Sequence, residues 1–497
     1  IATSNPVRTT EHPGPHRLYW GDFHGGQIPM AEKITDFFRY ARDVAAIDFA
    51  GYQRNDHAVS TRDWELQQEA ERGFNEPGRF VPIPGFEWSA GTAEGGHHNV
   101  YFRRQGQPIR RSSHSGLPPE ESDTDTDLPH ILDVYACYRN TDVVITPHVG
   151  GEHADLTHHD PSLEPALEVV STHGSFEWFL REALACGYRL GFLGGSDSHT
   201  GRPGTDHPGH QARRYAKSGL TAILAEALTV PALLEALVAR RCYATTGARM
   251  LVEASADGRT VGEEYSTGTA PEITVSVVGT APLESLTLYR GIRPIYDHPI
   301  HDAPPGDRVR VLWEGASRQT SYSGVIWDGL LRLRGGTIAS TEELRFDSPR
   351  SSSWQNDDGS IGWHAVTCGY QGGLVLDITG GSAPELELAV ASSVITGPQY
   401  GGHGDRPPRR MSYAPAESLT FHLKLDELKA GPRWFDLGTL DRGITVSLLP
   451  ETEPPRAAGF TLTDTDLEPG INPYWLRAVQ TDMEAAWSSP IFVDYAP

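Results

Sequence analysis

The sequence predicts an N-terminal α/β half, in which parallel strands are joined by crossover helices, followed by an all-β half that resembles an antiparallel sandwich. Short β-rich runs alternate with helical patterns from about residue 18 to 248, which is typical of parallel strands with crossover connections. From residue 249 onward, strands alternate with turns rich in Gly, Pro, Asp and Ser. The 497 residues also exceed what one hydrophobic core usually serves. We therefore predict an extension (1–17), an α/β domain (18–248) and a β-sandwich-like domain (249–497) packed on it.

Eight β-rich runs are the strand candidates of the N-terminal half. They are residues 18–24, 45–52, 80–88, 98–102, 142–148, 167–173, 189–197 and 219–224. Three helices are expected between them. The first carries apolar residues at helical spacing, namely Met30, Ile34, Phe37, Phe38 and Ala41. The second begins at Ser60, with Asp63 as its capping partner, and the third covers about 175–186 and stops at Gly187. Residues 104–127, rich in Ser, Pro, Asp and Arg, are predicted to form a long surface loop of the kind that often acts as a lid.

The C-terminal half offers shorter strand patterns and several tryptophans. The clearest strands are residues 272–278, 286–289, 374–377, 386–391, 418–423 and 459–463. Trp313, Trp327, Trp354 and Trp363 fall in one stretch, and two interpretations are open for them: they lean over the active face of the first domain, or they anchor the core of the sandwich.

The amino-acid composition favours a folded globular protein and argues against nucleic-acid or membrane binding. Hydrophobic residues make up 38% and charged residues 22%, as in folded globular proteins. The 42 Lys and Arg against 65 Asp and Glu give a net charge of −23, which repels nucleic acid and anionic membranes, so neither is an expected partner. The four cysteines are scattered, which favours free thiols, and the chain has no run of about 18 apolar residues. We expect a cytoplasmic protein.

Histidine and acidic side chains gather at the ends of the predicted strands. They are Asp22, His24, Asp56, His57, Glu87, His148, His173, Asp197 and His199. In a parallel barrel the carboxyl ends of the strands converge on one face, where such barrels place their active sites. Each of these residues alone is more often structural, but their joint occurrence is improbable by chance. Imidazoles and carboxylates that converge are typical of sites for zinc, manganese or iron.

The same segments resemble the PHP (polymerase and histidinol phosphatase) superfamily, and more closely the bacterial branch known as domain of unknown function 3604. The motifs that carry the resemblance are GDFHGG (21–26), NDH (55–57), GFEWSA (85–90), GHHNVYF (96–102), TPH (146–148), STHGSFE (171–177), GGSDSHTGRPG (194–204), RCYATTGAR (241–249) and AWSSPIF (486–492). The resemblance implies a distorted seven-stranded (β/α) barrel with one to three divalent ions at its carboxyl end, and metal-assisted hydrolysis.

Position by position, the resemblance also implies ligands. His24 matches the first His of the family's His-x-His, and the later ligand positions match His57, Glu87, His148, His173, Asp197 and His199. Glu87 takes the place of a bridging carboxylate. The second His is replaced by Gly26, and no Asp follows at the usual interval, so we expect one or two ions (Zn, Mn or Fe). Asp22 lies two residues before His24 on the same strand face and is expected either to coordinate or to orient.

The remaining site residues have more than one candidate role. Asp197 is a general base or a ligand, and His199 is a general acid or a ligand. Arg202 either holds an anionic group of the substrate or is a surface residue of a turn. Of His97 and His98, strand alternation allows only one to point inward, and we favour His97, either as a residue that supports a metal ligand from behind or as a substrate contact. His153, His158 and His159 are expected in solvated loops.

Three functional hypotheses follow. The first is a hydrolase that uses metal-activated water on an ester, phosphoester, lactone, amide or glycosidic bond of a small polar substrate. The second is a metal-dependent lyase or ring-opening enzyme, and the third is a barrel that has lost catalysis and only binds. A serine hydrolase is excluded because the Gly-x-Ser-x-Gly elbow is missing, and nucleotide-binding fingerprints are missing as well.

Overall fold

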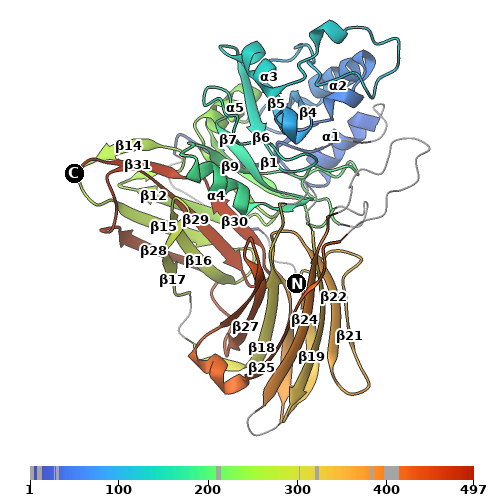
Figure 1. The fold of residues 1–497 in the computed structure, drawn as a ribbon. Coiled ribbons are helices and arrows are strands. Elements are labelled where there is room, and N and C mark those ends of the chain that lie inside the picture. Colours follow the sequence, from blue (N-terminus) through green and yellow to red (C-terminus); the bar gives the residue numbers. More distant parts are fainter. Residues whose placement is uncertain are drawn as a thin grey trace.

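The molecule has three parts, which Figure 1 shows as an α/β part at the top, a β part at the left and a long-stranded sandwich at the bottom right. The computed structural model describes residues 5–7, 14–26, 28, 33–208, 214–300, 303–318, 324–380, 384–396 and 413–497. These residues form five α-helices: α1 (Ile34–Asp43), α2 (Thr61–Phe74), α3 (Ile131–Tyr138), α4 (Glu177–Ala185) and α5 (Val230–Val238). Short 3-10 helices are η2 (Asp56–Ala58), η3 (Thr92–Glu94), η4 (Thr124–Thr126) and η5 (Leu425–Ala430).

The chain begins with two strand–helix–strand units. β1 (Arg17–Asp22), β2 (Phe49–Gly51) and β3 (Val81–Ile83) are parallel, with α1 and α2 as the connections. The apolar spacing predicted for α1 is confirmed from Ile34 onward, because Ile34, Phe37, Phe38 and Ala41 are buried. Met30 lies outside the described residues. The predicted start of α2 is also confirmed, since the Ser60 hydroxyl accepts a hydrogen bond from the Asp63 amide at 3.0 Å.

The next strands form two small sheets. β4 (Gly85–Ser89), β5 (His97–Phe102) and β6 (Val143–Pro147) are antiparallel. β7 (Ala166–Ser171) is parallel to β9 (Gly191–Gly194), with α4 between them, and pairs with the short β8 (Gly174–Ser175). A strand is observed within each of the eight predicted runs, but β2 covers only part of 45–52 and β9 only part of 189–197. One run is divided, because Pro84 has no amide to donate to a ladder and separates β3 from β4.

The strand pairing differs from the predicted distorted seven-stranded (β/α) barrel. Besides the antiparallel β4–β5–β6 sheet, β10 (Leu220–Ala225) is antiparallel to both β1 and β11 (Cys242–Thr245). The described residues therefore show a mixed α/β part with few helices, and a closed parallel barrel is not among its hydrogen-bonded sheets. Apolar runs predict where strands lie, but their partners are chosen by tertiary packing.

The largest sheet continues from the α/β part into the end of the chain. β11 pairs with β30 (Ala485–Ser488), which pairs with β29 (Gly470–Gln480). Further strands of this sheet are β14 (Glu264–Thr267), β16 (Leu283–Arg290), β17 (Arg293–His298) and β31 (Ile491–Tyr495). A separate four-stranded sheet has the strand order β13 (Arg259–Thr260), β12 (Leu251–Ala256), β15 (Glu272–Val278) and β28 (Ala457–Thr463). Apolar residues of both sheets share one core with α1.

Two five-stranded antiparallel sheets form the sandwich. One contains β20 (Thr337–Leu344), β23 (Gly372–Thr379), β18 (Pro305–Glu314), β27 (Arg442–Pro450) and β26 (Arg433–Gly438). The other contains β21 (Ser352–Gln355), β22 (Ile361–Thr367), β19 (Val325–Arg334), β24 (Glu385–Val394) and β25 (Glu417–Lys424). The six predicted strands of the C-terminal half all lie within observed strands. Trp313, Trp327 and Trp363 are buried between the sheets, whereas Trp354 is exposed, so the core interpretation is the correct one for the first three.

The predicted loop at 104–127 is tied down on the α/β part. The guanidinium of Arg111 is fully buried and donates to the Val59 carbonyl and to Asp123. No described helix is long and apolar enough to cross a membrane. The cysteines are free thiols, with Cys242 and Cys368 buried and Cys137 and Cys186 exposed.

Candidate metal centre

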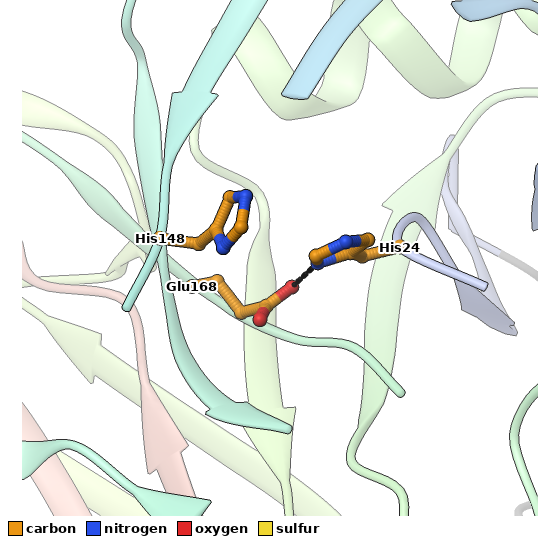
Figure 2. Close-up of side chains that lie close together, drawn as sticks. All are labelled: His24, His148 and Glu168. Atoms are coloured by element: carbon orange, nitrogen blue, oxygen red, sulfur yellow. Dashed lines mark hydrogen bonds and ion pairs between the residues drawn. The ribbon is translucent and has the colours of Figure 1, made fainter. Parts of the chain in front are cut away.

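Six buried side chains meet where the strands of the α/β part end. They are His24 after β1, Glu87 in β4, His97 at the start of β5, His148 after β6, Glu168 in β7 and Asp197 after β9. Three of them, drawn in Figure 2, point toward one another from separate strands. A chain brings six such polar groups out of water only if they are paired or bind an ion, because an isolated buried charge is costly.

The donor atoms of this cluster are spaced as metal ligands are. From Nε2 of His24, an oxygen of Glu87 lies at 3.6 Å and one of Asp197 at 3.7 Å. Nε2 of His148 lies 3.6 Å from the other Glu87 oxygen, and Nδ1 of His97 lies 2.6 Å from that same oxygen. Ligands that lie about 2.0–2.2 Å from a common ion are on the order of 3–3.5 Å apart. Gaps of 3.6–3.7 Å between donors are too long for hydrogen bonds and suit atoms that share a cation.

Three overlapping groups of ligand-spaced atoms arise in this way. They are His24, His148 and Glu168; Glu87, His97 and His148; and His24, Glu87 and Asp197. Within the first group, Nδ1 of His24 donates to Glu168 at 3.0 Å (Figure 2), which leaves Nε2 of His24 to face the other carboxylates. An imidazole oriented by a carboxylate on its second nitrogen is the arrangement found at most histidine-ligated metals.

Unpaired nitrogens support the fit of a metal to this cluster. Nε2 of His24 and both ring nitrogens of His148 are buried and have no hydrogen-bond partner among the described residues. Buried polar atoms are nearly always satisfied, so each exception needs an explanation. A divalent cation explains these atoms, because neutral imidazole nitrogens coordinate it through the lone pairs that are otherwise unused.

The electrostatics keep the carboxylates ionised in spite of burial. Burial alone would raise the pKa of Glu87, but His97, His24 and His148 hold it well below its usual value. The pKa of Asp197 also lies well below its usual value, because Arg214, His24 and His173 outweigh the effect of burial. Two ionised carboxylates in a buried site are what a cation requires.

The imidazoles divide into two kinds. Burial would lower the pKa of His24, but Glu168 and Asp197 raise it well above 6.5. For His148, burial together with neighbouring His24 lowers the pKa well below 6.5, so its ring is neutral. Burial raises the pKa of Glu168 to about 7. Carboxylates that favour a proton on His24 would favour a metal ion in the same space.

Asp22 orients the site and does not join the donor cluster. One of its oxygens accepts from the amides of His24 at 3.1 Å and Ser196 at 3.0 Å, and the other accepts from Gly204 at 2.9 Å. Of the two roles expected for Asp22, the geometry favours orientation over coordination, because both carboxylate oxygens accept hydrogen bonds from backbone amides. The carboxylate instead joins the end of β1 to the loop that carries Asp197.

The presence of glycine at position 26, where the motif has its second His, has a steric cause. The φ of Gly26 is +73°, and a Cβ at this position would overlap the backbone of Ser198. The loop after β9 therefore occupies the space that a second His of the His-x-His motif would need, and only glycine is accommodated here.

His173 and His199 lie next to Asp197 but face an arginine. Nε2 of His173 is 2.8 Å from Asp197, and Nδ1 of His199 is 3.6 Å from it. Arg214 donates to both rings and lies 3.3 Å from the same carboxylate. Burial and Arg214 lower the pKa of His173 to about 3 and that of His199 to about 4, so both rings are neutral acceptors.

Two other predicted site residues lie outside the cluster. His57, on η2, is half-buried and belongs to none of the ligand-spaced groups in the described part of the chain. Arg202 is exposed, as its surface interpretation predicts. Its side chain projects from a turn whose backbone is held at the Ser198 hydroxyl. Sequence position alone placed both residues near the strand ends, but the direction of each side chain depends on the loop that carries it.

Two residues of the site were not among the predictions. Glu168 sits in the middle of the apolar strand ALEVVS, and a lone charge inside a buried strand is a signal that was available. Arg214 follows a polar segment and has no local pattern that marks it, so only the tertiary structure shows its role.

The two histidines of β5 point to opposite faces of the strand, as strand alternation requires. His97 faces Glu87 on the inner side of the strand. Its ring belongs to a group of ligand-spaced atoms, so a role as metal ligand is added to the roles expected from the sequence. His98 turns to the other side, where Nε2 lies 3.2 Å from Glu164. Glu164 also accepts from His159 at 2.8 Å, so the prediction of a solvated His159 is wrong; its ring is buried and stacks on Tyr188.

Comparison with known proteins supports part of the predicted resemblance. The family model "Protein of unknown function (DUF3604)" matches residues 29–158. An uncharacterized protein of Chlamydia pneumoniae is 27% identical over 326 residues, which are 58% of this chain and 50% of that protein. An uncharacterized protein of Chlamydia trachomatis is 23% identical over the same shares. The chain thus spans about half the length of the curated relatives it matches.

A solved structure gives a weaker likeness. It is a two-domain protein from Bacteroides vulgatus that contains a predicted PHP-like metal-dependent phosphoesterase, and it is 12% identical with a TM-score of 0.34. The likeness covers 83% of this chain and 100% of that one. At this level of similarity, the metal centre has to be judged from its own geometry.

Proposed function

We propose that the chain is a metal-dependent hydrolase of the PHP type that acts on a small polar substrate. The observation that carries the proposal is the set of six buried donors in three ligand-spaced groups. Imidazole and carboxylate donors of this mixture suit Zn²⁺, Mn²⁺ or Fe²⁺. The proposal includes a barrel-like arrangement of the strand ends around the site, as the PHP resemblance implies.

The residues that would hold the metal are His24, Glu87, His97, His148, Glu168 and Asp197. Because they form overlapping groups that share His24, Glu87 and His148, they suit one or two ions. A divalent ion at such a site supplies Lewis-acid polarisation and lowers the pKa of water from 15.7 to about 7.

The chain's own residues would prepare the site and move protons. Asp22 fixes the backbone at His24, and Glu168 fixes the ring of His24. Asp197 is ionised and is the proposed ligand or base. His199 has a side chain that is 24% exposed, more than any of the six donors, and a neutral ring. Because Nδ1 accepts from Arg214, the proton of this neutral ring is on Nε2, from which it can donate a hydrogen bond to the substrate.

The test is to measure metal content and hydrolysis in the same preparations. We expect the purified protein to hold one or two divalent ions per chain by elemental analysis and to hydrolyse at least one of p-nitrophenyl phosphate, bis(p-nitrophenyl) phosphate and p-nitrophenyl acetate. A chelator should abolish turnover, and Mn²⁺ or Zn²⁺ should restore it. Turnover in H₂¹⁸O should place solvent oxygen in a product, which separates hydrolysis from elimination.

Variants connect the activity to the cluster. Glu87→Gln and His148→Ala should each reduce metal content and lower kcat/KM by at least about 100-fold. The matched control is His57→Ala, because His57 was predicted from sequence but lies outside the donor groups; it should keep its metal. Unchanged metal content in both cluster variants would overturn the proposed site.

A further inference from the structure

We propose that the guanidinium of Arg214 is a fixed cation at one end of the site and takes the place of a divalent ion beside Asp197, His173 and His199. This inference rests on the proposed function, because it concerns how many ions the same site holds. It departs from the ligand set that the family resemblance implies, in which both histidines are metal ligands.

The contacts of Arg214 occupy the lone pairs that a metal would use. Nη1 donates to Nε2 of His173 and lies 3.3 Å from Oδ2 of Asp197, while Nη2 donates to Nδ1 of His199. A guanidinium has only donors and stays charged at any pH at which the protein folds. An imidazole nitrogen that accepts an Arg N–H cannot at the same time coordinate an ion. The arginine is 5% exposed, so its charge is held inside the site.

The spacing of the remaining donors gives the same division. None of the ligand-spaced groups among the described residues includes His173 or His199. Asp197 lies at the border: Oδ1 lies 3.7 Å from Nε2 of His24 and 3.6 Å from Nδ1 of His199, whereas Oδ2 contacts only His173 and Arg214 in this group and so belongs to the guanidinium end. One oxygen of this carboxylate is thus directed to the proposed metal end and the other to the guanidinium end.

The formal charge of the cluster is consistent with this arrangement. With all three carboxyl groups ionised, as they would be around a bound cation, Glu87, Glu168 and Asp197 contribute three negative charges, and Arg214 contributes one positive charge. The remaining two negative charges are balanced by one divalent ion. Without the guanidinium, an additional cation would be needed beside Asp197, since an uncompensated buried carboxylate is unfavourable.

The experiment counts ions in the full-length protein. Arg214→Met keeps an apolar chain of similar length but removes the charge and the donors. After saturation with Mn²⁺ and gel filtration, elemental analysis and spin counting by electron paramagnetic resonance should find one more Mn²⁺ per chain in this variant than in the wild type. Arg202→Met is the matched control, because this arginine belongs to the same region but is exposed, and it should keep the wild-type count. Adding His173→Ala to Arg214→Met should remove the extra ion.

Two results would overturn the inference while the proposed function stands. One is an equal Mn²⁺ count in the wild type and in a folded Arg214→Met variant. The other is the loss of an ion from the wild type on His173→Ala alone, which would show that this imidazole is already a ligand. The second measurement does not depend on whether Arg214→Met folds, and an unchanged count in His173→Ala supports the inference. A wild type that binds no metal would overturn the proposed function, and this inference with it.

Discussion

At the scale of single residues, each buried carboxylate of the site has its own hydrogen-bond or ion-pair partners. Asp22 satisfies three backbone amides, Glu168 directs one ring, and Asp197 stands between a histidine and an arginine. A buried carboxyl without such partners behaves differently, and Glu71 on α2 is the example. It is fully buried, Gln67 donates to one oxygen at 2.9 Å, and the other oxygen has no hydrogen-bond partner among the described residues.

The burial of Glu71 predicts that the stability of the protein depends on pH. Burial raises the pKa of Glu71 to about 8, and Gln67 and Arg72 offset this only in part, so the folded protein keeps a proton on Glu71 at neutral pH. In the unfolded chain the same group ionises near its model value of 4.5. Between about pH 4.5 and 8 the folded state therefore binds the proton and the unfolded state does not, and this residue lowers stability as pH rises through that window.

Glu71→Gln should remove this pH dependence. At pH 5 the variant and the wild type should have similar free energies of unfolding, and at pH 8 the variant should be more stable by on the order of 2–4 kcal/mol. The measurement is urea denaturation at both pH values. Glu69→Gln, an exposed position on the same helix, is the control and should keep the pH profile of the wild type. A variant with the same pH profile as the wild type would show that Glu71 is ionised in the folded protein.

At the scale of elements, the sandwich uses glycines beneath tryptophan rings. Gly329 on β19 lies directly opposite Trp363 on β22, and a Cβ at Gly329 would overlap that ring. Trp363 is 1% exposed and stacks on Trp313 at 5.2 Å, so the ring has no space into which to move. Trp354 covers Gly362 in the same way on the edge strand β21.

Gly329→Ala should therefore destabilise the protein, although alanine suits most strands at least as well as glycine. Overpacking of a filled core costs about 1–3 kcal/mol, and the midpoint of urea unfolding should fall accordingly. The control is Gly73→Ala on α2, where a Cβ would meet no atom within 4 Å and helix propensity predicts a gain of roughly 0.5–1 kcal/mol. An unchanged midpoint for Gly329→Ala would mean that Trp363 adjusts at no cost.

At the scale of the whole molecule, the end of the chain completes the α/β part. β11 pairs with β10 on one side and with β30 on the other. Trp475 packs against Phe192 at 5.8 Å, and the hydroxyl of Ser489 accepts from the amide of Phe192 at 2.9 Å. Strands from both sides of the predicted border between residues 248 and 249 thus pair in one sheet.

A fragment of residues 14–248 should lack a cooperative thermal transition. It would leave β11 as an unpaired edge and expose the apolar surface that Trp475 covers, which is unfavourable and promotes aggregation. Circular dichroism during heating, compared with the full chain in the same buffer, measures this. A fragment that unfolds cooperatively within a few degrees of the full chain would show that residues 18–248 are an independent domain.

Much of the local structure could be predicted because it depends on local physics. The capped start of α2 at Ser60, the apolar stripe of α1 and the alternation that separates His97 from His98 are properties of neighbouring residues. The pairing of strands could not be predicted in the same way. The antiparallel direction of β10 and the pairing of β11 with β30 are set by contacts between distant segments.

By itself, the sequence determined which residue types stand at the ends of the strands, and hence that imidazoles and carboxylates would gather there. Only the tertiary structure decided which of them meet. It brought Glu168 and Arg214 to the cluster and left His57 and Arg202 outside it, because a side chain's direction depends on the loop that holds its backbone. Proximity among residues up to 190 positions apart is a property of packing, and no local pattern in the chain encodes it.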